Sequence, residues 1–285
     1  MTLRLHNGAD SVEIDPDRGG RLASLLIDGR ERLLREPGGA SVEPALAWGC
    51  YLMAPFAGRL FDGKVNWDGR SVQLRRNNGP HAIHGVAFDT PWSVTDEGPD
   101  FVALATALDR DRWPFGGEVR QKFTLSRGKL AIFAEIEAVL AMPAALGWHP
   151  WFVRESGDMR VRVASDRILV TGSDLIPTGE TAAVDAAHDL RESRPVDDLA
   201  LDNVYTSAKS PAVLCWPDVE LSIDFGTPID TVVVYTHPMA VCVEPQTAWP
   251  DAIRLAQQGC ADTGLAALEA GQRLVATTTW TWRPR

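Results

Sequence analysis

Seven polar or charged residues could carry chemistry in this chain, because each lies in a strand-like or turn-like stretch in a chain rich in tryptophan. They are Arg59, His81, His84, His149, Asp202, Glu244 and Asp251. The sequence has no glycine-rich phosphate loop, no G-x-S-x-G nucleophile elbow and no H-E-x-x-H helix. The chemistry left open is proton transfer between carboxylates and imidazoles, metal binding by imidazoles, or hydrolysis by paired carboxylates.

Glu244 follows residues 241–243, an apolar run that is typical of a buried strand, and Pro245 ends the strand pairing directly after it. A carboxylate in that place loses hydration, which raises its pKa toward the range that suits a general base. The alternative is a buried ion pair, with Arg59 as the partner. Asp202 belongs to the stretch LDNVY at 201–205, which equally fits an ordinary turn.

His149 interrupts an apolar run that covers residues 144–153. An imidazole in such surroundings must find a hydrogen-bond partner or line a cavity. His81 and His84 lie three residues apart in a predicted turn at residues 78–85. Turns on a rigid sheet often display binding groups, and a structural role for both histidines is the alternative. Two histidines at this spacing, with a third histidine and two carboxylates elsewhere, would also suffice for a zinc site.

The composition excludes several classes of partner. With a formal net charge of -10 and no basic run, the chain fits neither a nucleic-acid-binding protein nor a protein of acidic membrane surfaces. It has no signal-peptide core and no run of about 18 apolar residues. We therefore expect a soluble cytoplasmic protein, with monomer and homodimer both open. The cysteines lack metal-finger spacing, which favours buried free thiols; they are Cys50, Cys215, Cys242 and Cys260.

The elements that would position these residues are predicted to be short antiparallel strands. Three Asp-Gly pairs, at 28–29, 62–63 and 68–69, stand between alternating runs and indicate tight hairpin turns. Strands are predicted at 11–15, 21–27, 64–67, 71–74, 101–108, 118–125, 130–140, 159–163, 167–170, 212–216, 219–225, 231–236 and 273–282. Residues 264–271 fit either a turn or two of helix or a loop. No linker marks a boundary, so we expect one all-β domain over residues 1–285, a large antiparallel β-sandwich.

Several of these stretches, taken together, resemble the aldose 1-epimerase (galactose mutarotase) family along nearly the whole chain. The stretches are GGRLASLLIDG at 19–29, PFAGRLFDG at 55–63, HAIHG at 81–85, GWHPWF at 147–152 and EPQTAWPDA at 244–252. Each is unremarkable alone, but the ordered set at these separations is fairly specific. The resemblance implies a large β-sandwich with a cleft on one sheet, no cofactor, and interconversion of the α and β anomers of a free sugar.

The resemblance also implies roles for individual residues. Glu244 would take the proton from the anomeric hydroxyl and His149 would protonate the ring oxygen, so that the ring opens and recloses as the other anomer. His84 would support the ring oxygen or a neighbouring hydroxyl, and Arg59 and Asp202 would hold hydroxyls. Proton transfer of this kind needs neither a metal nor a redox group.

Further contacts are expected around this set. Asn78, His81 and Trp148 would contact the sugar, with shaping of the turn as the alternative for Asn78 and His81. Trp148, Trp151 and Trp249 flank the proposed acid and base and indicate a pocket narrowed by indoles. The family often has asparagine before the loop arginine, whereas this chain has Gly58, which removes one possible polar contact.

Three alternatives to a mutarotase of neutral sugars stay open. An anionic sugar, such as a hexose 6-phosphate or a sulfonated sugar, would need additional cationic groups, and the chain offers Arg75, Arg76 and Arg112 besides Arg59. A non-catalytic sugar-binding protein would not need both Glu244 and His149. A glycoside hydrolase would use Asp202 and Glu244 as paired carboxylates, which leaves the histidines without a task.

Overall fold

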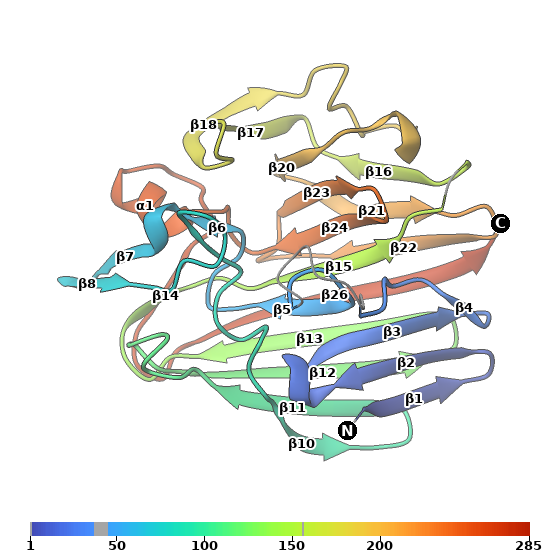
Figure 1. Cartoon of the computed structure of the whole chain (residues 1–285), viewed down its shortest axis with the longest axis horizontal. Helices are drawn as coiled ribbons and strands as arrows, with labels where there is room; N and C mark the ends of the chain where they lie inside the picture. Colours follow the sequence, from blue (N-terminus) through green and yellow to red (C-terminus); the bar gives the residue numbers. More distant parts are fainter. Residues whose placement is uncertain (1, 37–44, 156) are drawn as a thin grey trace.

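The structure is a computed structural model that describes residues 2–36, 45–155 and 157–285. Two large antiparallel sheets dominate it, as the sequence predicts, and they are layered over one another (Figure 1). The larger sheet, of 11 strands, consists in spatial order of β1 (Leu3–Asn7), β2 (Asp10–Asp15), β3 (Arg21–Ile27), β5 (Cys50–Met53), β15 (Gly147–Val153), β24 (Ala240–Gln246), β23 (Thr231–His237), β20 (Asp202–Thr206), β17 (Arg167–Thr171) and β18 (Pro177–Ala183), with β4 (Arg30–Glu31) beside β3.

The second sheet, of nine strands, faces the larger one. It consists of β10 (Ser93–Glu97), β11 (Phe101–Ala107), β12 (Glu118–Ser126), β13 (Lys129–Glu137), β26 (Arg273–Pro284), β22 (Val219–Phe225), β21 (Lys209–Cys215), β16 (Arg160–Ala164) and β19 (Arg194–Pro195). Three two-stranded pairs complete the strands of the described residues: β6 (Arg59–Leu60) with β9 (Ala82–Ile83), β7 (Lys64–Trp67) with β8 (Arg70–Gln73), and β14 (Met142–Ala144) with β25 (Ala266–Leu268).

Helical structure is sparse in the described part of the chain. It comprises the α-helix α1 (Ala252–Gln257) and the short 3₁₀ helices η1 (Pro16–Arg18), η2 (Phe61–Gly63) and η3 (Val196–Asp198). α1 lies beside the β7–β8 hairpin at one side of the molecule (Figure 1). No helix of the described residues is long and apolar enough to cross a membrane.

Most of the predicted strands are present, and the turns explain where several begin. Asp28 and Asp68 have φ of 50° and 46°, and the glycines after them also have positive φ, as tight hairpin turns require. These two turns close the β3–β4 and β7–β8 hairpins. The third Asp-Gly pair differs from the prediction, because it lies in η2 and joins no paired strands. Residues 264–271 form no helix but contain the strand β25.

The residues of β5, β15 and β24 alternate between two hydrophobic clusters. One cluster fills the space between the sheets and includes Trp148 and Phe152 together with Trp280 of the second sheet. The other lies on the opposite face of the larger sheet and includes Tyr51, Trp151 and Cys242. Every residue of β24 is buried, and so is every residue of β15 except the last. A strand that is buried on both faces shows no polar–apolar alternation, which explains the continuous apolar runs in the sequence.

The cysteines of the chain are free, and three of them, Cys50, Cys215 and Cys242, are buried. This confirms the expectation of buried thiols for those three. Cys260 is only partly buried.

Candidate active site

A cavity of about 220 Å³ opens on the face of the larger sheet that points away from the second sheet. Strands β15, β24, β23 and β20 supply its floor, and loops near residues 58, 78, 84 and 250 supply its walls. Seven of the residues predicted from the sequence line it: Arg59, Asn78, His84, His149, Trp151, Asp202 and Glu244. These predicted residues are up to 185 positions apart in the sequence, from Arg59 to Glu244.

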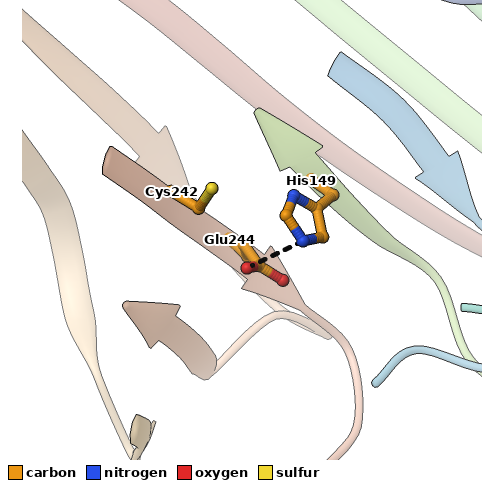
Figure 2. A group of neighbouring side chains, drawn as sticks. All are labelled: His149, Cys242 and Glu244. Atoms are coloured by element: carbon orange, nitrogen blue, oxygen red, sulfur yellow. Dashed lines mark ion pairs between the residues drawn. The ribbon is translucent and has the colours of Figure 1, made fainter. Parts of the chain in front are cut away.

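His149 and Glu244 form the central pair of this cavity. The pairing of Gly147 with Gln246 and of Trp151 with Cys242 places them opposite each other on β15 and β24. The Nε2 atom of His149 lies 3.3 Å from Oε1 of Glu244 (Figure 2). The two side chains are nearly inaccessible, at 5% and 2% exposure for the whole residues. Gln246 donates a hydrogen bond to the other carboxylate oxygen, at 3.2 Å.

The environment shifts the pKa values of this pair in opposite directions. Burial raises the pKa of Glu244 well above its usual value, and the nearby charge of Asp202 adds to the shift. Burial lowers the pKa of His149 to about 3, with smaller contributions from the charges of Arg21 and Arg59. Both shifts penalise the charged form of the group concerned. Burial in this cavity therefore disfavours both the carboxylate of Glu244 and the imidazolium of His149.

The imidazole of His149 contacts two larger aromatic rings. Tyr51 stacks on one face of the imidazole with ring centroids 5.0 Å apart, and Trp151 stacks on the imidazole with centroids 5.1 Å apart. The guanidinium of Arg21 lies 5.1 Å from the centroid of the Tyr51 ring and 4.2 Å from that of Trp48. Close packing against the rings of Tyr51 and Trp151 restricts the orientation of the imidazole.

Arg21 is buried, and no carboxylate of the described residues is hydrogen-bonded to it. It donates hydrogen bonds to four backbone carbonyl oxygens, those of Arg18, Ala45, Trp48 and Phe88. Burial lowers the pKa of its guanidinium to about 10, which leaves it positive at neutral pH. The positive charge of Arg21 therefore contributes to the lowered pKa of His149, with the ring of Tyr51 in contact with both side chains.

His84 forms a second wall of the cavity beside His149. Its ring meets that of His149 edge-on, with centroids 4.9 Å apart, and it also contacts Tyr51. Burial, together with the charges of His149 and Arg59, lowers its pKa well below the usual value. Its Nδ1 atom is buried and has no hydrogen-bond partner among the described residues. A neutral imidazole with an unpartnered nitrogen is suited to exchange a hydrogen bond with a bound hydroxyl.

Arg59 joins two further cavity residues into a polar group. Its Nη2 lies 3.4 Å from Oδ2 of Asp202, and its Nε donates to Oδ1 of Asn78 at 3.3 Å. The ion pair that the sequence allowed between Arg59 and Glu244 is not the one observed, since Arg59 pairs with Asp202. Arg59 and Asp202 retain 22% and 31% side-chain exposure, so both present polar atoms to the open part of the cavity.

Two residues predicted to contact a sugar lie elsewhere. Trp148 is fully buried in the cluster between the sheets, on the opposite face of β15 from His149. His81 accepts a hydrogen bond from the backbone N–H of Asp62 at 3.1 Å, and its Nε2 lies 3.5 Å from Asp174. Neither residue lines the cavity. His81 anchors the turn that carries His84, which was the structural alternative.

Asp251, the last of the seven candidates, is a structural carboxylate. It accepts a hydrogen bond from the backbone N–H of Phe61 at 3.1 Å and pairs with Arg254. Burial raises its pKa. Trp249 packs in a separate small cluster with Leu169 and Leu255. The glutamate-bearing stretch thus contributes Glu244 and Gln246 to the cavity floor, and Asp251 fixes the loop that follows.

Sequence reasoning missed several residues at the cavity, among them Gln246, Tyr235 and His237. Gln246 lies two positions after Glu244 on one strand, so strand alternation would have placed it on the same face. The same rule applies to Cys242, two positions before Glu244. Arg21 carries no such signal, because an arginine in a hairpin strand is usually exposed.

The comparisons with known proteins concern the chain as a whole. The sequence profile of the aldose 1-epimerase family matches residues 1–280. This chain belongs to the aldose 1-epimerase family. Galactose mutarotase of Bos taurus is 31% identical over 153 residues, which cover 50% of this chain and 44% of that relative. Maltose epimerase of Levilactobacillus brevis is 24% identical over 203 residues, covering 65% of this chain and 59% of that relative.

The chain spans about half the length of the curated relatives that it matches. Its fold extends further than that sequence similarity. The crystal structure of galactose 1-epimerase from Lactobacillus acidophilus NCFM superposes with a TM-score of 0.82 at 18% identity and covers 99% of this chain and 94% of that one. The likeness at this identity shows a common fold.

At position 58 this aldose 1-epimerase family member has glycine in place of the asparagine that is common in the family, and the structure gives a physical reason. Gly58 has a φ of +67°, and a Cβ atom built on it would lie 2.6 Å from Cβ and Cγ of Pro250. Pro250 therefore occupies the space that a side chain at position 58 would need. Both residues line the cavity, so an apolar ring stands where a polar amide was expected.

The other arginines that the sequence offered for an anionic sugar lie outside this cavity. Arg75 and Arg112 line a separate cavity together with Asp89 and Asp111. Arg76 pairs with Asp62. Among the described residues that line the main cavity, Arg59 is the one lysine or arginine.

Proposed function

We propose that this protein is an active aldose 1-epimerase that interconverts the α and β anomers of a neutral free sugar. The observation that carries the proposal is the contact between His149 and Glu244 at the floor of the cavity, with 3.3 Å between Nε2 and Oε1. An imidazole and a carboxyl group at this distance can hold one proton between them. Mutarotation consumes and restores one such proton in each cycle.

The proton balance of the reaction follows from this pair. Glu244 takes the proton of the anomeric hydroxyl, and the electrons of that O–H bond form the aldehyde double bond. The bond from C1 to the ring oxygen breaks, and its electron pair takes a proton from His149. Rotation about the C1–C2 bond and the reverse transfers give the other anomer. Each positioned acid or base contributes roughly 10²–10⁴-fold to the rate.

Burial supports the intermediate of this cycle. When the ring is open, Glu244 is protonated and His149 is neutral, which is the form that the raised pKa of the carboxyl group and the lowered pKa of the imidazole favour. The charge-separated form is needed when the closed sugar is bound. The guanidinium of Arg59 lowers the pKa of Glu244 and so favours the carboxylate in that step.

The charges around the cavity support a neutral sugar. Arg59, its one cationic side chain among the described lining residues, is already paired with Asp202, and Glu244 adds a further acidic group. A phosphate or sulfonate would need several donors or cations that are not engaged elsewhere. The name of the L. brevis relative, maltose epimerase, extends the candidate sugars to disaccharides with a free anomeric carbon.

The two remaining alternatives fit the geometry less well. A glycoside hydrolase would need two carboxyl groups as acid and base, whereas the nearest partner of Glu244 is an imidazole and that of Asp202 is Arg59. A sugar-binding protein without activity would pay the cost of burying a titratable pair without using it. Both predict an inert protein in the assay below.

The test is the rate of anomer exchange, measured by polarimetry on freshly dissolved anomers or by NMR exchange, over a panel of hexoses, disaccharides and hexose 6-phosphates. We expect acceleration for a neutral sugar by the wild type and a loss of roughly 10²–10⁴-fold in Glu244→Gln and in His149→Asn. Matched controls are Glu137→Gln, on the second sheet, and His6→Asn, an exposed residue of β1. Full activity of Glu244→Gln would overturn the mechanism.

A further inference from the structure

Cys242 lies beside two residues of the cavity floor, and together they form a group of three side chains of the types that ligate metals. The group consists of His149, Cys242 and Glu244, whose ligand atoms all lie within 4.8 Å of one another. We propose that this group binds a thiophilic divalent cation such as Zn²⁺, and that the bound ion reversibly inhibits the enzyme. The inhibition rests on the proposed function, whereas the binding does not.

The arrangement of the three ligands follows from the sheet. Cys242 and Glu244 are two positions apart on β24 and so project from the same face, and His149 reaches them from the neighbouring strand β15 (Figure 2). Zinc bonds to nitrogen and oxygen are about 2.0–2.1 Å long, so two such ligands of a tetrahedral ion are about 3.3 Å apart. Nε2 of His149 and Oε1 of Glu244 already have a separation of 3.3 Å.

The donor set selects the kind of ion. One thiolate sulfur, one imidazole nitrogen and one carboxylate oxygen match the preferences of Zn²⁺ and similar ions, whereas Mg²⁺ and Ca²⁺ require mainly oxygen ligands. Three protein ligands leave one tetrahedral position open, as in zinc sites that exchange a water or another small ligand. His149 and Glu244 both line the cavity, so this open position would face it.

The surroundings favour an exchangeable ion over a structural one. A histidine that holds a structural metal usually donates its second ring nitrogen to a carboxylate or carbonyl group. Nδ1 of His149 is buried and has no such partner among the described residues. Within the part of the chain that the structure describes, this is also the one group of three or more such side chains that could hold an ion.

Binding and catalysis exclude each other at this site. The ion would occupy the lone pairs of Nε2 and of Oε1, which are the atoms that exchange the proton in the proposed mechanism. Cys242 has no part in that mechanism, because its thiol takes no proton from the sugar and it does not line the cavity. Removal of the sulfur should therefore weaken inhibition and leave anomer exchange intact.

The first experiment titrates Zn²⁺ into the anomer-exchange assay in a buffer that does not chelate metals. We expect the wild type to lose activity and to regain it with EDTA, and Cys242→Ala to need at least about 10-fold more Zn²⁺ for the same inhibition, with unchanged activity in the absence of metal. Cys242→Ser is the conservative variant, with an oxygen in place of the sulfur. The matched control is Cys215→Ala, a buried cysteine of the second sheet, which should keep the sensitivity of the wild type.

The second experiment reads metal binding without activity. Co²⁺ added to the wild type should produce a thiolate-to-cobalt charge-transfer absorption that Cys242→Ala lacks and Cys215→Ala keeps. A cobalt spectrum in a protein without epimerase activity would overturn the proposed function and leave the metal site standing. An active wild type without this absorption, or equal zinc sensitivity of wild type and Cys242→Ala, would overturn the metal site.

Discussion

The two faces of the larger sheet use the same strands for different purposes. On β5, β15 and β24 the side chains that face the second sheet are apolar or indole groups, and they are Leu52, Trp148, Phe152, Val241 and Val243. Alternate positions on the same strands line the cavity, among them Tyr51, His149, Trp151 and Glu244. Both sets are almost equally buried. Burial therefore does not distinguish the face that packs against the second sheet from the face that lines the cavity.

The difference lies in what burial does to each set. The burial of apolar groups lowers the free energy of the folded state. A carboxyl group and an imidazole lose hydration. This raises the pKa of the carboxyl group and lowers the pKa of the imidazole, and each shift disfavours the charged form. The cavity face thus stores an unfavourable arrangement that the proposed chemistry uses, and the core face supplies the stability that permits it. Substitutions on the two faces should consequently have opposite effects.

The largest effect is expected on the core face. Trp148→Ala removes a fully buried indole from the cluster between the sheets. We expect the free energy of unfolding to fall by about 3–5 kcal/mol, as for other large-to-small core substitutions. Urea unfolding followed by circular dichroism measures this, and anomer exchange per folded molecule should change little. A variant of normal stability that has lost sugar affinity would instead assign Trp148 to the substrate.

A smaller effect of opposite sign is expected on the cavity face. The pKa of Glu244 in the folded protein is raised, first by burial and then by Asp202. Such a group favours the folded state below its unfolded pKa of about 4.3, and this contribution is lost as the pH rises through the folded pKa. Glu244→Gln should therefore have a higher Tm than the wild type at pH 7, with the difference shrinking toward pH 4.5.

The matched substitution Glu137→Gln should behave in the opposite way. The pKa of Glu137 is lowered, chiefly by a hydrogen bond from Arg120. A group of this kind stabilises the fold above its unfolded pKa, so its removal should slightly lower Tm at pH 7. If Glu244→Gln lowered Tm as well, the carboxyl group of Glu244 would belong with the structural side chains and the contrast between the faces would fail.

The smallest effect is expected from Arg21, whose guanidinium lies against the ring of Tyr51. Burial is the main cause of the low pKa of His149, and the charge of Arg21 adds to it. In Arg21→Met we expect the acid limb of the pH–kcat/KM profile to move to higher pH, because the imidazole gains a proton more readily. Arg21→Lys retains the charge and should leave the limb in place. Equal profiles for both variants would show that Arg21 acts only through packing.

The sequence predicts the strands well where one face meets water and poorly where both faces are buried. Asp-Gly turns and alternation located the β7–β8 hairpin, and residues 219–225 form β22 as expected. On β15 the apolar run hides the alternation, so the sequence gives no sign that Trp148 and His149 lie on opposite faces of the strand. Strand β25 was missed because a three-residue strand carries too little pattern.

For the site, sequence and resemblance together named most of the side chains that the cavity collects, but not their pairing. Arg59 was available to either carboxylate, and the fold brings it to Asp202. The sequence already favoured His84 over His81 for substrate contact, and the hydrogen bond from the backbone of Asp62 to His81 supports the structural alternative for His81. Arg21 influences His149 because both side chains contact Tyr51 on a neighbouring strand. This arrangement depends on the order of the strands in the sheet, which the local sequence does not indicate.

The contact between Gly58 and Pro250 constrains how this pocket can change in evolution. Any side chain at position 58 collides with the ring of Pro250 and is also strained by the positive φ of the backbone. A new group at position 58 is therefore accessible only after position 250 has changed. The two loops form an epistatic pair, and a shift in sugar preference through this wall of the cavity has to pass through Pro250 first.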